Sequence, residues 1–135
     1  MAAWLSAGPD EAVVSHESAL DLHRLSSVIP EAVHLTVPRS KRYRPASPGA
    51  AIHTSTRSFG ARDFTVVDGI RVTTPTRSIV DSAEAGTAPE QIIAAVHQAL
   101  ERGTTTQNKL LGVARQSGGR VARLIQQAIE QVQAQ

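Results

Sequence analysis

Five histidines have the widest chemical range in this chain, since imidazole can ligate a metal or carry a proton near neutral pH. His16-Glu17 begins like the metal-binding helix of zinc proteases, but the second ligand position, four residues on, is a leucine. His16 and His23 are seven residues apart, so one helical face can carry both. His34 or His53 could approach that face in space. We predict no metal site and expect His16 to have a structural role near the start of its helix.

A nuclease site would need clustered carboxylates that hold a metal ion and a lysine that orients the attacking water. Only two lysines occur, Lys41 and Lys109, and neither follows a carboxylate at a useful spacing. The chain also lacks a glycine-rich phosphate loop and a nucleophile elbow. It has no cysteine, which removes thiol catalysis, disulfides and cysteine-ligated zinc. We therefore predict a protein that is not an enzyme and uses no cofactor.

A short basic segment is the best candidate for binding a partner. Its members are Arg39, Lys41, Arg42, Tyr43 and Arg44. Arginine pairs bidentately with carboxylate or phosphate, and Tyr43 adds a flat amphipathic contact. An acidic protein surface or nucleic acid would satisfy such a segment, whereas a solvated surface loop is the simpler interpretation. The basic excess continues to Arg71, because the range 39–71 holds seven lysines and arginines against two aspartates.

The composition is that of one globular domain spanning residues 1–135, with 41% hydrophobic and 19% charged residues and a net charge of +2. The start of the chain lacks the basic and then apolar pattern of a secretion signal, and no apolar run approaches membrane-spanning length. We expect a cytoplasmic protein with no membrane partner.

The clearest elements are a hairpin and the helix after it. Alternating apolar residues flank Asp68-Gly69, a dipeptide that favours a type I′ turn because both of its positions need positive φ. Thr74 then suits a helix N-cap, and Pro75 suits the first helical position.

The remaining patterns divide the chain into two parts. In residues 10–85 we expect a helix from Ser15 to about Leu25, a strand over 33–37, a second short strand near Ile52 and the hairpin. Residues 86–135 are wholly helical in pattern. This segregation predicts an α+β fold with a small, mostly antiparallel sheet with helices and a helical C-terminal third. The last two helices carry long apolar stripes, which predict an exposed face for a homodimer or another partner.

Three segments, in order, resemble the C-terminal domain of AbiEi-family antitoxins. Residues 63–83 are similar to that family's pattern D-V-T-V-x-D-G-I-P-V-T-S-P-x-R-T-L-x-D-L-A. Residues 15–25 are similar to its S-H-x-S-A-A-x-L-x-G-L helix, and residues 33–39 to its V-x-V-T-V-P-R strand. Arg24 and Ser82 depart from the family's glycine and leucine.

The family pairs with nucleotidyltransferase toxins, so the resemblance implies an antitoxin that neutralises such a toxin by direct binding, with the basic segment as the toxin contact. It also implies that Arg77 and Asp81 form a buried, fold-organising pair. The residues of this fold-organising motif are Ser15, His16, Asp68, Gly69, Thr74, Pro75, Arg77 and Asp81.

AbiEi-like proteins usually carry a winged helix-turn-helix domain before this one. Met1 stands about ten residues ahead of the first matching segment, so we expect no promoter repression through such a domain. The alternative function is a DNA-binding regulator of its own operon that uses the basic region Arg39–Arg71.

Overall fold

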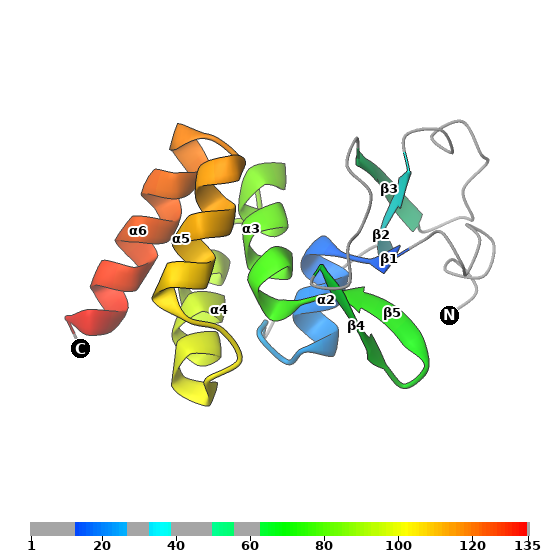
Figure 1. The fold of residues 1–135 in the computed structure, drawn as a ribbon, viewed down its shortest axis with the longest axis horizontal. Helices are drawn as coiled ribbons and strands as arrows, with labels where there is room; N and C mark the ends of the chain where they lie inside the picture. Colours follow the sequence, from blue (N-terminus) through cyan, green and yellow to red (C-terminus); the bar gives the residue numbers. More distant parts are fainter. Residues whose placement is uncertain (1–12, 27–32, 39–49, 56–62, 135) are drawn as a thin grey trace.

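Strands and helices occupy opposite ends of the molecule, with α2 between them (Figure 1). The computed structural model describes residues 13–26, 33–38, 50–55 and 63–134. The elements, in chain order, are β1 (Val13–Val14), α2 (His16–Leu22), β2 (Val33–Pro38), β3 (Ala50–Ser55), β4 (Phe64–Val67), β5 (Ile70–Thr73), α3 (Pro75–Ala85), α4 (Pro89–Arg102), α5 (Gln107–Gln116) and α6 (Gly119–Gln133). The predicted α+β class and the helical C-terminal third are confirmed.

The described strands form one sheet in the order β3-β2-β1-β5-β4. β1 pairs antiparallel with β2 and β4 pairs antiparallel with β5, whereas β2–β3 and β1–β5 are parallel. The sheet is therefore mixed, and the prediction of a mostly antiparallel sheet is wrong. A two-residue turn can only join antiparallel strands, so parallel neighbours need a longer connection that leaves no local sequence signal. The two-residue strand β1 was not anticipated either.

The hairpin and the start of α3 form as predicted. Asp68 (φ 51°) and Gly69 (φ 78°) both take left-handed backbone, as a type I′ turn requires. The Thr74 hydroxyl accepts a hydrogen bond from the Arg77 backbone N–H at 3.3 Å, and Pro75 occupies the first helical position. Thr74 thus gives one free backbone N–H at this helix end a partner, and Pro75 has no backbone N–H that would need one.

At the C-terminal ends of α2 and α3, arginines from helices later in the chain bind backbone carbonyl groups. α2 ends at Leu22, short of the predicted Leu25, because Arg24 takes left-handed backbone with φ 57°. Arg102 Nη1 then donates to the His23 carbonyl at 3.2 Å. In the same way Arg120 Nη2 donates to the Glu84 carbonyl, at 2.9 Å, where α3 ends. These contacts tie α4 to α2 and α6 to α3.

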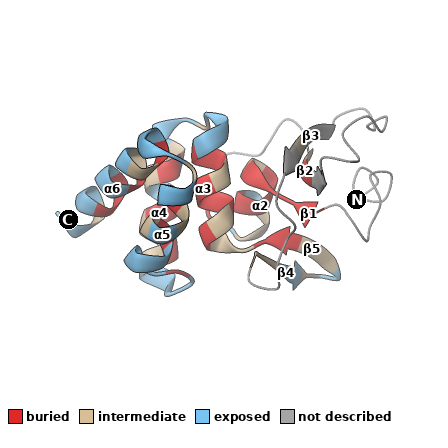
Figure 2. Cartoon of the chain, turned by 45° about the horizontal axis from the view of Figure 1, so that its top comes forward, coloured by how far each residue is buried: buried red, intermediate tan, exposed pale blue. Residues whose placement is uncertain are grey.

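Two apolar clusters lie on either side of α2 (Figure 2). The larger has fifteen buried residues, drawn from α3–α6 together with Leu20 and Leu25. The smaller includes, among the described residues, Val14, Ala19, Leu35 and Val72. The helical end therefore has a core of its own, separate from the cluster that joins α2 to the sheet.

The apolar stripes of α5 and α6 are covered. Leu110, Val121 and Ile125 are buried within the larger cluster, because α3, α4, α5 and α6 pack against one another. The only large apolar side chain that the described ranges leave exposed is Val66 on β4, at 59%. The predicted exposed apolar helical face is therefore wrong, since the helices need no sheet to bury their stripes. Within the same ranges, no helix combines the length and apolarity needed to cross a bilayer.

Arg24 offers a test of backbone strain. A residue with a Cβ in left-handed backbone costs roughly 1 kcal/mol, which glycine avoids. We expect Arg24→Gly to raise the free energy of unfolding by about 0.5–1 kcal/mol, measured by urea titration. Arg24→Ala keeps the strain and removes the same exposed side chain, so it serves as the matched control. An equal change in both variants would contradict this explanation.

Ser82 offers a test of polar burial. It is 0% exposed, and its Oγ has no hydrogen-bond partner among the described residues. An unsatisfied buried hydroxyl costs about 1–3 kcal/mol, so Ser82→Ala should stabilise the fold by about 1 kcal/mol in thermal unfolding. The control is Ser78→Ala on the same helix. It should destabilise the fold, because Ser78 Oγ bonds the Thr74 carbonyl at 2.7 Å. Destabilisation by Ser82→Ala would show that the hydroxyl is satisfied.

Candidate functional site

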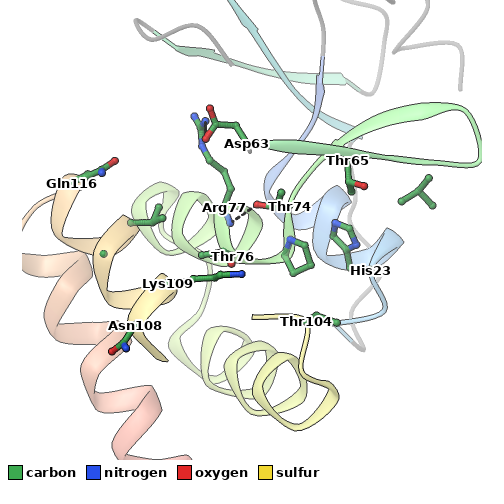
Figure 3. A pocket seen from close by; sticks show the side chains of 14 residues that line it. His23, Asp63, Thr65, Thr74, Thr76, Arg77, Thr104, Asn108, Lys109 and Gln116 are labelled. Carbon is green, nitrogen blue, oxygen red and sulfur yellow. Dashed lines mark hydrogen bonds and ion pairs between the residues drawn. The ribbon is translucent and has the colours of Figure 1, made fainter. Parts of the chain in front are cut away.

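An open groove of about 1080 Å³ separates the β4–β5 hairpin from α5 (Figure 3). The end of α2 and the first turn of α3 form its other walls. Its lining residues are His23, Asp63, Thr65, Val67, Thr74, Pro75, Thr76, Arg77, Thr104, Asn108, Lys109, Gly112, Val113 and Gln116. The groove was not predicted from the sequence, because its walls come from segments that are far apart in the chain and carry no binding motif of their own.

The walls of the groove are held by hydrogen bonds between elements. His23 Nε2 donates to the Thr73 carbonyl at 2.7 Å, which joins the end of α2 to β5. Thr76 Oγ1 bonds Thr105 Oγ1, which joins α3 to the segment before α5. Lys109 lies on the rim and, in the part of the chain that the structure describes, forms no ion pair. The groove therefore has fixed walls and one positive charge without a counter-ion in those ranges.

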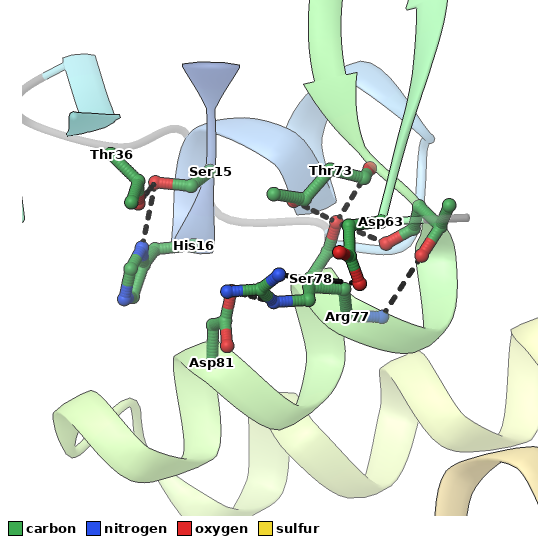
Figure 4. Close-up of polar contacts among 9 residues, drawn as sticks. Ser15, His16, Thr36, Asp63, Thr73, Arg77, Ser78 and Asp81 are labelled. Carbon is green, nitrogen blue, oxygen red and sulfur yellow. Dashed lines mark hydrogen bonds and ion pairs between the residues drawn. The ribbon is translucent and has the colours of Figure 1, made fainter. Parts of the chain in front are cut away.

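Arg77 lies between two carboxylates at one end of the groove (Figure 4). Its Nη1 is 3.3 Å from Asp63 Oδ1, and its Nε is 3.3 Å from Asp81 Oδ2. The Arg77 and Asp81 side chains are each only 14% exposed. The predicted intrahelical pair is thus present and largely buried, and the structure adds Asp63 as a second partner that spacing did not suggest.

The Asp81 carboxyl has an unusual proton affinity. Its pKa is raised from 3.8 to about 6, chiefly by burial and also by the neighbouring Glu84 and Asp63 charges. The Arg77 charge and hydrogen bond lower the pKa but do not offset the burial. The folded protein therefore binds this proton more tightly than the unfolded chain does. The stabilisation from that proton is fully present below pH about 4, and is lost as the pH rises through about 6.

Ser15 and His16 lie where β1 ends and α2 begins (Figure 4). Ser15 takes the N-cap position, but its hydroxyl makes no capping bond. Its Oγ instead accepts from Thr36 Oγ1 at 2.7 Å and contacts His16 Nδ1 at 2.8 Å. Ser15 is 0% exposed and His16 only 8%. This hydroxyl–imidazole pair is therefore closed to a substrate and joins α2 to β2.

Three of the five histidines meet in space. The His16 and His53 rings stack with centroids 3.6 Å apart, and the His34 and His53 centroids are 5.2 Å apart. His23 does not join them, since it lies in the groove wall. Among the described residues, no set of three or more His, Asp or Glu side chains is arranged to hold a metal ion. Local sequence carries no signal for this cluster, because its rings come from α2, β2 and β3.

The residues predicted to contact a toxin, Arg39, Lys41, Arg42, Tyr43 and Arg44, lie outside the described residues. Of the wider basic region 39–71, the structure places the Arg71 guanidinium over the Phe64 ring, 4.8 Å from its centroid. No protein-family model matches this chain, and the comparison with curated proteins also finds no match. The family resemblance therefore stays a prediction that rests on the three segments.

Arg77 allows the charge network to be tested. Arg77→Met keeps most of the side-chain volume but leaves the Asp81 carboxylate buried without its counter-ion. Breaking a buried pair costs on the order of 3 kcal/mol, so we expect a loss of that size in urea unfolding at pH 7. At pH 5 the loss should be smaller, because a neutral Asp81 needs no partner.

The control for this experiment is Arg115→Met on the exposed face of α5, which should change stability little. Adding Asp81→Leu to Arg77→Met should restore part of the stability at pH 7, because no buried charge remains unpaired at that position. A loss that is equal at pH 5 and pH 7 would contradict the role assigned to Asp81.

Proposed function

We propose that this chain is a binding module, an antitoxin that neutralises a cognate nucleotidyltransferase toxin in the cytoplasm by direct contact. The observation that carries the proposal is that the three segments with the family resemblance fold against one another. Thr36 on β2 bonds Ser15 at the start of α2, and the His34 backbone N–H bonds Ser18 Oγ on α2 at 2.8 Å. The third segment supplies β4, β5 and α3, and its Thr73 carbonyl accepts from His23 Nε2 of the first segment at 2.7 Å.

The polar residues of the resemblance are thus mainly bonding partners of one another. A pattern of this kind specifies a scaffold, and a scaffold acts through the surface that it presents. Ser15, Thr36 and Ser78 are all buried. Their hydroxyls are engaged within the fold, which favours a binding role over a catalytic one for this part of the chain.

The groove is the concave surface that suits a protein partner. Val67 and Val113 supply apolar contact, and Asn108 and Gln116 supply amide groups that donate and accept hydrogen bonds. Lys109 adds a positive charge that would favour an acidic side chain of the toxin. The basic segment 39–44 directly follows β2 in the sequence and would contribute further charge of the same sign.

The proposal is tested by blocking the groove. Gly112 lines it from α5, and a Cβ at this position would meet no atom within 4 Å. Gly112→Trp should therefore leave the fold intact and fill the groove. We expect at least about a tenfold loss of affinity for the nucleotidyltransferase encoded beside this chain's gene, a change of about 1.4 kcal/mol, measured by calorimetry and by rescue of growth on co-expression.

Gly112→Ala is the matched control, because it also replaces glycine with a residue that has a Cβ but leaves the groove open. Equal affinities for the Trp and Ala variants would exclude the groove as the docking site. Absence of any complex at micromolar concentration, together with no growth rescue, would overturn the antitoxin proposal. Binding to the operon's own promoter with an affinity that falls steeply as salt rises would instead support the DNA-binding alternative.

A further inference from the structure

Three imidazole rings from three elements meet where the sheet contacts α2. His16 begins α2, His34 lies on β2 and His53 lies on β3. His53 stacks on His16, and His53 Nε2 lies 3.0 Å from His34 Nδ1. We propose that His16, His34 and His53 form a proton-operated latch, which holds β2 and β3 on α2 at neutral pH and releases them in acid.

Both ring nitrogens of His34 have a partner. His34 Nε2 lies 3.4 Å from Glu17 Oε2, and an ionised carboxylate can only accept, so this nitrogen carries a proton. When His34 is neutral its Nδ1 is an acceptor, and His53 Nε2 donates to it. Hydrogen bonds then connect His53 through His34 to Glu17. A second proton on His34 would reverse the bond between the two rings, because Nδ1 would donate and His53 Nε2 would have to accept.

The hydrogen bonds of Ser15 likewise indicate which nitrogen of His16 carries the proton. Thr36 Oγ1 donates to Ser15 Oγ, so the proton of the Ser15 hydroxyl is available to His16 Nδ1 at 2.8 Å. His16 is then neutral, with its own proton on Nε2. Protonation at Nδ1 would reverse this bond, so that His16 donates to Ser15 Oγ, and would charge a ring that is only 8% exposed.

Charges from the neighbouring elements favour the neutral state. Burial and, to a lesser degree, His53, His34 and Arg77 on α3 together lower the pKa of His16 to about 3. Burial also lowers the pKa of His53, and His34 adds to this effect. The charged groups that face the cluster in the described ranges are Glu17 on α2 and the Arg77–Asp81 pair on α3; β1 supplies only valines.

The direction of the pH effect follows from these shifts. The folded pKa of His16 lies below its unfolded value of 6.5, so the neutral rings contribute fully above pH 6.5. Their contribution is lost as the pH falls from 6.5 toward 3. Each ring that must be neutral in the closed state raises the open fraction by about tenfold per pH unit in this range. His53, whose pKa is also lowered by burial, adds to this rise.

β2 and β3 meet the rest of the sheet through β1. Among the described residues, two pairs, Val13↔Thr36 and Val14↔Leu35, join β2 to β1. In the same ranges Leu35 is the strand residue of β2 that belongs to the buried apolar cluster on this side. A segment joined to its neighbours by few sheet bonds opens at a low free energy. We therefore expect the latch to control the opening of β2 and β3.

Native-state hydrogen exchange of the full chain from pH 7 to pH 4.5, corrected for intrinsic rates, tests the proposal. The opening constant of the β2 and β3 amides should rise as the pH falls below 6.5, by about tenfold per pH unit from His16 and by more with His53. The amides of α4–α6 should keep a much weaker dependence. His53→Phe keeps a stacked ring that cannot titrate, so the rise should be smaller than in the wild type. The control, His97→Gln on α4, should match the wild type.

A rise that is unchanged by His53→Phe would overturn the latch, as would β2 and β3 amides that follow the same pH dependence as α4–α6. If His53→Phe does not fold, the wild-type imidazole NMR signals decide the question. A His16 ring that stays neutral below pH 5 supports the proposal, and a His16 ring that titrates near pH 6.5 overturns it.

Discussion

The Arg77 guanidinium is the interaction on which the arrangement of sheet and helices depends. It joins Asp63, which precedes β4, to Asp81 in the second turn of α3. The Asp63 carbonyl also accepts from the Thr74 backbone N–H at 3.1 Å, so hairpin and helix are held at two points. That fixed angle places the hairpin opposite α5 and thereby creates the groove. Because Asp81 is buried, the charge of Arg77 is needed at neutral pH for this geometry to persist.

α2 divides the molecule into two regions of different strength. Its Leu20 side chain belongs to the helical core, whereas Ala19 packs with the strands. The helical region is held by apolar contact and by arginines at helix ends, which respond little to pH. In the described part of the strand region, hydroxyls and imidazoles add polar bonds to the apolar cluster, and the bonds of the imidazoles depend on protonation. The same short helix, α2, therefore packs against apolar side chains on one side and forms polar bonds on the other.

Local chemistry was predictable from the sequence, and long-range pairing was not. The Asp68-Gly69 turn, the Thr74 cap and the Arg77–Asp81 pair follow from residues close together in the chain, and all three are present. The parallel pairing of Val14 with Val72 depends on residues far apart, and no spacing rule reports it. For the same reason the groove was not predicted, and an approach of His34 or His53 to the His16 face was raised only as a possibility. The apolar stripes were recognised, but they were predicted to form an exposed face for a homodimer or another partner, whereas neighbouring helices cover them.

The central position of β1 also has a consequence for synthesis on the ribosome. β1 pairs with β2 soon after both emerge, but its other neighbour, β5, is translated much later. Until Val72 leaves the exit tunnel, one edge of the nascent sheet lacks its partner, and Val14 and Leu35 lack part of their apolar cover. Such edges recruit chaperones, proteases or other chains. Between the translation of β3 and that of β5, we therefore expect the nascent sheet to present one unpaired edge to such partners.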